Sequence, residues 1–168
     1  MRTVRTGRYT ADPSEPVVVF LIGMRLNKPW KIWKWWPVFT AMRPMLRRLK
    51  QDPDLGLLHA QTGLLGRGPM LVCYFRSLEH LYRFATSQNE PHVGPWRQFN
   101  RKVRDSGDVG IWHETYLVRP EHTECVYGNM PPWGLAAATS LVPVARRGHS
   151  AARRAGLTTE DSPVVAPY

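Results

Sequence analysis

The stretch HVGPWRQFNRKVRDSGDVGIWHETYLVR, residues 92–119, decides how this chain folds. Gly94-Pro95 predicts the start of a helix that runs to Arg104, because proline suits the first helical turn. Ser106-Gly107 predicts a turn, and the apolar run over 109–118 predicts a strand. The stretch therefore predicts a helix and a strand that complete a mixed α and β domain.

The chain before this stretch alternates between strand and helix patterns. VVVFLIGM, residues 17–24, is a continuous apolar run typical of a strand buried on both faces. Pro44 predicts a kink or a break in the first helix, and Ser77 is a favourable N-cap for the second. The predicted elements are a strand over 17–24, a helix over 34–50, strands over 55–65 and 70–76, and a helix over 78–85. With the last helix and strand, this order predicts an α+β, ferredoxin-like split βαβ fold, in which an antiparallel sheet carries its helices on one face.

Composition divides the chain into three segments. Residues 1–16 predict an extended N-terminal arm, and residues 17–133 predict one domain with its own core. Residues 134–168 are rich in Ala, Arg, Pro, Ser and Thr, which predicts a disordered basic tail. A short edge strand is expected over 124–129. No run of about 18 uncharged apolar residues and no signal-peptide pattern is present, so a cytoplasmic protein is expected.

Three ordered motifs resemble one family. They are Gly-Met24-Arg25-x-Asn-Lys-Pro-Trp30, His92-x-Gly-Pro-Trp96-x-x-Phe-Asn100 and Gly110-Ile-Trp112-His113-Glu114-Thr-Tyr116. Together with Tyr127-x-Asn129-Met-Pro-Pro132, they resemble the monooxygenase-like proteins typified by an antibiotic-biosynthesis-type monooxygenase of fumagillin biosynthesis. The resemblance covers roughly residues 15–135.

The resemblance implies a homodimeric α+β barrel, in which two ferredoxin-like protomers set their sheets face to face. Each protomer then keeps a pocket between its own sheet and helices. The wider group includes cofactor-independent oxygenases that act on polyketides, and also haem-binding relatives. A fold does not fix a reaction, so the resemblance narrows the chemistry without assigning it.

Three residues are candidates for the acid or base of such a reaction: His92, His113 and Glu114. Histidine is the natural proton carrier near neutral pH. Side chains alternate along a strand, so His113 faces one side of the sheet while Glu114 and Tyr116 face the other. The sequence leaves open which side lines a pocket. It also leaves open a purely structural role for each residue.

Substrate binding is expected from aromatic and polar groups around the same pocket, namely Arg25, Trp36, Trp96, Asn100, Trp112 and Tyr116. The expected substrate is a small apolar, polyketide- or terpenoid-like molecule, with molecular oxygen as co-substrate. A cofactor-free oxygenase needs a dry aromatic pocket, a base and hydrogen bonds to a substrate anion. No spacing typical of a metal site is present. Haem is the alternative cofactor, with His59, His92 and His113 as candidate ligands.

The charge of the chain, +10, is concentrated between Arg25 and Lys50, where eight basic residues occur with no acidic one. The same segment holds Trp30, Trp33, Trp35 and Trp36. One interpretation is a pocket lid whose lysines face solvent, which the family pattern favours. A second is peripheral membrane contact, because tryptophan and lysine together suit a lipid interface. No nucleic acid partner is expected, since no binding fold is apparent.

Overall fold

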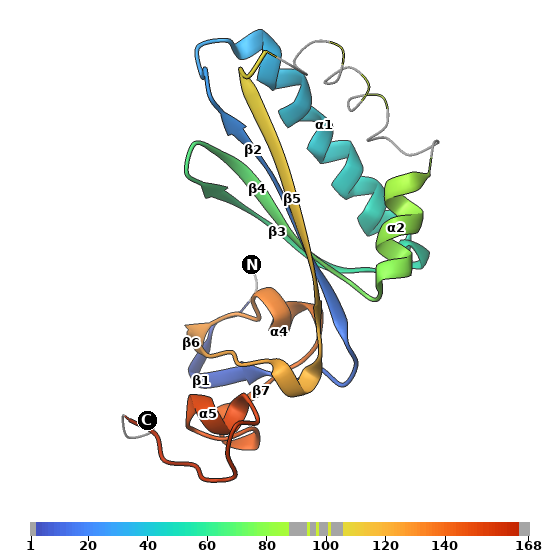
Figure 1. Ribbon diagram of the computed structural model, residues 1–168. Helices are drawn as coiled ribbons and strands as arrows, with labels where there is room; N and C mark the ends of the chain where they lie inside the picture. The colour runs from blue at the N-terminus through green and yellow to red at the C-terminus, as the bar shows by residue number, and fades with distance from the viewer. Residues whose placement is uncertain (1–2, 88–93, 95–96, 98–100, 102–105, 165–168) are drawn as a thin grey trace. The chain divides into compact units, whose positions relative to one another are not determined.

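The computed structural model describes residues 3–87, 94, 97, 101 and 106–164 (Figure 1). The chain divides into two compact units. The central unit is Val18–Tyr116, and the terminal unit combines Met1–Val17 with Leu117–Tyr168. No helix among the described residues is long and apolar enough to cross a membrane.

The central unit contains a four-stranded sheet with helices on one face, as Figure 1 shows. Its sheet order is β3-β4-β2-β5, and β4 pairs antiparallel with both β2 and β3. Two helices, α1 and α2, connect these strands in the order β-α-β-β-α-β, which confirms the α+β, ferredoxin-like class. The described chain forms no closed barrel. The elements are β2 Val17–Leu26, α1 Ile32–Gln51, β3 Leu57–Leu65, β4 Gly68–Phe75, α2 Leu78–Thr86 and β5 Val109–Val118, with a short 3-10 turn over Pro53–Leu55.

The first helix forms one continuous element although it contains two prolines, so the division into two pieces expected at Pro44 does not occur. A proline removes one backbone donor from the helical ladder. Near Pro37 the Thr40 hydroxyl donates to the carbonyls of Trp36 and Pro37, at 3.0 and 3.1 Å. The apolar face of α1 packs on the sheet, and this burial holds the helix together across both prolines.

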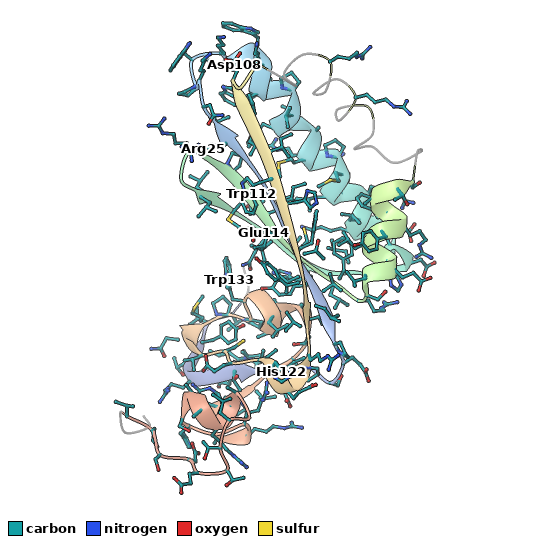
Figure 2. All side chains as sticks on the ribbon, viewed as in Figure 1. Arg25, Asp108, Trp112, Glu114, His122 and Trp133 are labelled. Atoms are coloured by element: carbon teal, nitrogen blue, oxygen red, sulfur yellow. The ribbon has the colours of Figure 1, made fainter. Side chains whose placement is uncertain are left out.

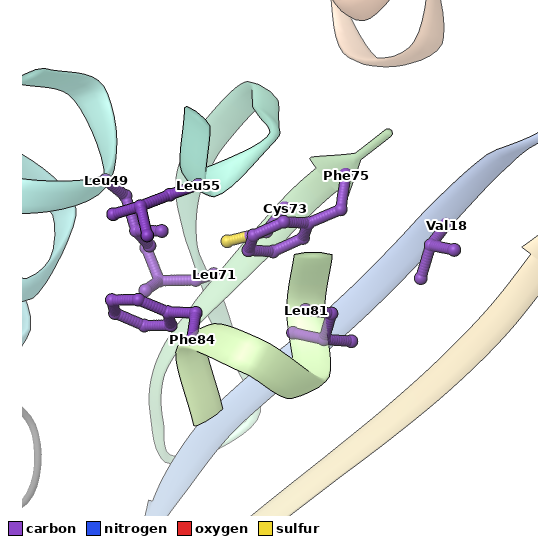
Figure 3. Close-up of a cluster of buried hydrophobic side chains, with 8 residues drawn as sticks. All are labelled: Val18, Leu49, Leu55, Leu71, Cys73, Phe75, Leu81 and Phe84. Carbon is purple, nitrogen blue, oxygen red and sulfur yellow. The ribbon is translucent and has the colours of Figure 1, made fainter. Parts of the chain in front are cut away.

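The core of the central unit lies between the sheet and the two helices (Figure 3). Phe75 and Leu71 on β4 are at most 1% exposed, and they face Leu81 and Phe84 of α2 and Leu49 of α1. The N-cap expected at Ser77 is present, with its hydroxyl accepting from the His80 backbone N–H. The apolar runs of the sequence therefore mark the same side chains that fill this core.

The terminal unit contains a three-stranded antiparallel sheet of order β6-β1-β7. The strands are β1 Arg5–Ala11, β6 Tyr127–Met130 and β7 Leu141–Pro143, with helices α4 Gly134–Ala138 and α5 Ala151–Arg154 and 3-10 turns over Pro120–His122 and Val144–Arg146. Two expectations differ from this structure. The N-terminal arm contains strand β1, and the tail expected to be disordered over 134–168 contains β7, α4 and α5.

Two arginines of the tail explain this difference, and one of them, Arg154, is buried. The Arg147 guanidinium donates to the carbonyls of Ala11, Pro120 and Arg154, at 3.0 to 3.2 Å. Arg154 is 4% exposed, and it pairs with Glu124 and donates to the Gly148 carbonyl. A compositional rule treats arginine as a solvated residue that favours disorder. Here two arginines donate to backbone carbonyls of the strand, turns and helix that make up the terminal unit.

Candidate functional site

An apolar cavity of about 200 Å³ lies in the central unit, between the sheet and the helices. Its walls come from Phe20 and Ile22 of β2, Ile111 of β5 and the inner side of α1, together with residues of β4 and α2. The described lining residues carry hydrocarbon, thioether or thiol side chains, apart from Gly23. Such a space binds apolar matter and excludes water, because it offers water few hydrogen-bonding partners.

Cys73 on β4 contributes a thiol to this wall. Burial raises the pKa of the Cys73 thiol to about 12. The thiolate is the nucleophile and the metal ligand, so a thiol held in the neutral form has neither function near neutral pH. Cys73 therefore belongs to the apolar wall.

Strand β5 places His113 on the cavity side of the sheet. Ile111 lines the cavity, and His113 follows two positions later on the same face. Its ring lies 5.8 Å, centroid to centroid, from the ring of Phe20, which also lines the cavity. The imidazole is exposed to solvent and contacts Phe20 from outside the described cavity lining.

The opposite face of β5 carries Trp112, Glu114 and Tyr116, of which Trp112 and Glu114 are labelled in Figure 2. Trp112 lies over Gly23 of β2, where a Cβ atom would come within 2.8 Å of the indole ring. The Tyr116 hydroxyl donates to Glu114 at 2.6 Å, and this hydrogen bond is the main cause of the raised pKa of Tyr116. The two predicted acid–base residues on β5, His113 and Glu114, thus lie on opposite faces of the sheet. His113 is the one on the face that the cavity borders.

The residues after β2 are held against the start of β5. Asn27 donates to the Gly107 carbonyl at 3.0 Å and accepts from Nε of Arg25 at 3.1 Å. Arg25 is exposed, on the same sheet face as Trp112. This network locates the predicted substrate ligand Arg25 at the end of the open face, away from the described cavity wall.

A buried carboxylate completes the same network. Asp108 is 1% exposed and pairs with Lys28, Lys31 and Lys34, at 2.8, 3.0 and 2.5 Å. Hydrogen bonds from these three ammonium groups hold the pKa of Asp108 well below its usual range. Sequence reasoning missed Asp108. The signal available was a lysine at every third position, 28, 31 and 34, without an acidic residue nearby in the sequence.

The tryptophans around the start of α1 do not line the described part of the cavity. Trp36, predicted to bind substrate, is 51% exposed, and Trp30 and Trp33 are more exposed still. Trp35 is the inward-facing member, with its indole N–H donating to the Pro29 carbonyl at 2.9 Å. These positions do not support the interpretation of this segment as a tryptophan wall of the pocket.

Three predicted site residues, His92, Trp96 and Asn100, lie outside the described residues. Gly94, Arg97 and Arg101 of the same segment are described, and all three are helical and exposed. The roles of His92 as a base and of Trp96 and Asn100 as substrate contacts stay predictions.

The described residues do not fit a haem site well. The described cavity wall has no histidine, and its Cys73 thiol is kept neutral by burial. His59 stacks on Tyr74 on the other face of the sheet, with ring centroids 6.2 Å apart. Within the described ranges, no group of three His, Cys, Asp or Glu side chains is placed to hold a metal ion.

Comparison with known proteins identifies relatives of this chain. Residues 17–135 match the family described as "Monooxygenase af470-like". Monooxygenase af470 of Aspergillus fumigatus is 29% identical over 140 residues, which cover 76% of this chain and 48% of that protein. This chain thus spans about half the length of its curated relative. No solved structure matches it significantly.

Proposed function

The chain belongs to the monooxygenase af470-like family, and from this premise we propose that it is a small monooxygenase-like enzyme that oxidises an apolar metabolite in its cavity without a required metal. The apolar cavity of the central unit is the observation that carries the proposal. The substrate class is polyketide- or terpenoid-like, because burying apolar carbon surface against hydrocarbon side chains makes the free energy of binding more favourable.

The reaction is the oxidation of an acidic methylene by molecular oxygen. A base removes one proton from the CH₂ group, and the resulting carbanion gives its electrons to O₂ to form a hydroperoxide. Loss of water from the hydroperoxide leaves a carbonyl group. In total, CH₂ and O₂ become C=O and H₂O, so the substrate supplies all four electrons and no other reductant is consumed.

His113 is the base of this proposal among the described residues. Its ring contacts Phe20, which lines the cavity, and its exposed side can return the proton to water. Glu114 lies on the opposite face of the sheet from the cavity. The apolar wall disfavours water near the carbanion, so oxygen competes better with reprotonation. His92 is a second base of this proposal, and Trp96 and Asn100 are substrate contacts, from the segment outside the described residues.

The open face of the sheet is proposed to bind a second copy of the chain. An antiparallel sheet is stable with one face covered by helices and the other free. Here the free face carries half-exposed apolar side chains in its centre, Leu21 of β2 and Met70 and Val72 of β4, and it also carries Trp112. Two such faces packed together would bury these groups and give the homodimeric barrel that the family resemblance implies.

Filling the cavity tests the proposed site. Ala41 lines the cavity from α1, and Arg47 is exposed on the outer side of the same helix. With anthrone, an apolar ketone with an acidic methylene, as the probe, oxygen uptake should fall by more than about tenfold in Ala41→Trp. It should stay unchanged in the matched control Arg47→Trp. Equal uptake by the two folded variants would place the reaction elsewhere.

A further inference from the structure

Four large apolar side chains are exposed together at the start of α1. Trp30, Ile32, Trp33 and Trp36 are 66%, 54%, 67% and 51% exposed, and they are called the tryptophan surface below. Ile32 and Trp33 lie one turn before Trp36, so helical spacing places all three on neighbouring parts of the outer side of α1. Burying such rings is strongly favourable, so their joint exposure indicates an interaction surface.

One ring of the tryptophan surface packs against side chains of the central unit. The Trp36 ring lies 5.7 Å from Phe39 and 5.8 Å from Trp35, centroid to centroid. Trp35 and Phe39 in turn pack against buried Met24 and Val109. Trp36 is therefore attached to the core of the central unit through Trp35 and Phe39.

Positive charge surrounds this surface. Lys28, Lys31 and Lys34 alternate with the exposed tryptophans, and Asp108 provides one negative charge against their three positive charges. Arg43 and Arg47 continue the exposed side of α1. Since the segment from Arg25 to Lys50 has no acidic residue, the surplus of positive charge is not cancelled within it.

We propose that the tryptophan surface docks onto an anionic lipid bilayer. Indole rings partition to the depth of lipid headgroups, and nearby cations are attracted to an anionic leaflet. Ile32 adds an aliphatic group that favours the acyl region over a nucleic acid, where bases stack on aromatic rings and phosphates need a basic groove. The combination of exposed indoles with surplus lysine charge therefore matches a bilayer better than a polynucleotide.

Docking would place α1 against the bilayer, and the inner side of this helix lines the cavity through Val38, Ala41 and Met42. An apolar substrate dissolved in lipid would then meet the protein at the helix that covers its site. This consequence rests on the proposed function. Docking itself does not, because vesicle binding is measured without any substrate.

Vesicle co-sedimentation tests the proposal with the full chain. Vesicles of phosphatidylcholine mixed equally with phosphatidylserine should bind the protein at least about tenfold more tightly than phosphatidylcholine alone at low salt, and high salt should reduce the difference. Changing Trp30, Trp33 and Trp36 together to alanine should weaken binding to the mixed vesicles by more than about tenfold. Trp133→Ala removes an exposed tryptophan of the terminal unit and should leave binding unchanged.

A second variant guards against misfolding. Changing only Trp30 and Trp33 keeps Trp36 on Phe39, and this variant should retain the far-UV circular dichroism of the native chain while it loses most vesicle binding. Absence of binding to the mixed vesicles would overturn the proposal. Equal binding by the native chain and the double variant would do the same. A change of oligomeric state in the triple variant without vesicles would instead assign the surface to a contact between copies.

Discussion

The two faces of the central sheet carry different functional groups. The helix-covered face forms one wall of an apolar cavity that includes Cys73, and His113 contacts Phe20 of that wall. The open face carries Trp112 over Gly23 and the Glu114–Tyr116 hydrogen bond. Because one strand, β5, serves both faces, a shift of one residue in its register would exchange the two sets of groups. The difference teaches that His113 and Glu114, although adjacent, cannot share one site.

The largest expected effect concerns the thiol on the covered face. With a pKa of about 12 raised by burial, Cys73 has about a thousandfold less thiolate near neutral pH than an ordinary thiol. In a Cys125→Ser variant, which leaves Cys73 as the single cysteine of the sequence, we expect alkylation by N-ethylmaleimide to be slower than that of N-acetylcysteine by about this factor. Labelling followed by mass spectrometry measures the rate.

Adding a ligand extends the measurement of the Cys73 alkylation rate. A saturating apolar molecule in the cavity should slow the alkylation of Cys73 further, because Cys73 lines the space that the molecule would fill. A rate close to that of the free thiol would show that the covered face is open to water, and would contradict the description of the cavity as dry.

The next effect concerns the open face. If a second copy covers it, Val72→Lys places an unpaired charge in the interface and should raise the dimer dissociation constant by more than about a hundredfold. Thr62→Lys adds the same charge at an exposed position on the other face, so it should leave the dimer intact. Sedimentation equilibrium separates the outcomes. A native chain that stays monomeric would refute the proposed dimer.

A smaller effect concerns the anchor of β5 itself. Asp108→Asn leaves three lysines without their shared carboxylate, so the free energy of unfolding should fall at neutral pH. Because the folded pKa of Asp108 is lowered, its contribution is complete above the unfolded pKa of about 3.9 and is lost as the pH falls toward the folded value. The stability difference between the native chain and the variant should therefore be constant above about pH 5 and shrink below it.

Urea unfolding across this pH range measures the effect. The control is Asp54→Asn, which removes an exposed carboxylate in the short 3-10 turn after α1 and should change stability little. A difference between native chain and Asp108→Asn that grew as the pH fell would have the wrong sign, and would contradict the role assigned to the carboxylate.

The sequence predicted the covered face well, because its signal is carried by local patterns. The apolar run over 17–24 and the helical spacing along α1 depend only on burial, which is the same physics in any fold. Alternation along β5 showed that His113 and Glu114 face opposite sides. Only the structure could assign the sides, because the choice depends on which face the helices cover.

The rest could not be predicted because its signals are long-range. The ion pairs of Asp108 join residues 74 or more positions apart, and Arg147 reaches the Ala11 carbonyl across 136 positions. Arginine in a polar tail ordinarily indicates disorder. The composition of residues 134–168 therefore predicted a disordered tail, and the strand and helices of this segment were not predicted. The tryptophans were interpreted as a pocket lid because the family pattern favours that position, and the exposure of Trp30, Trp33 and Trp36 is shown only by the structure.

The central claim, that the covered face is the reactive one, is tested most directly by oxygen uptake in two neighbouring variants. With anthrone as the probe, His113→Ala should lower the rate by about 10² or more, whereas Glu114→Gln should leave it within about twofold. The rate lost in His113→Ala should return in part with added imidazole, a readout that a purely structural role would not give. A large loss in Glu114→Gln with full activity in His113→Ala would contradict the account and move the reaction to the open face.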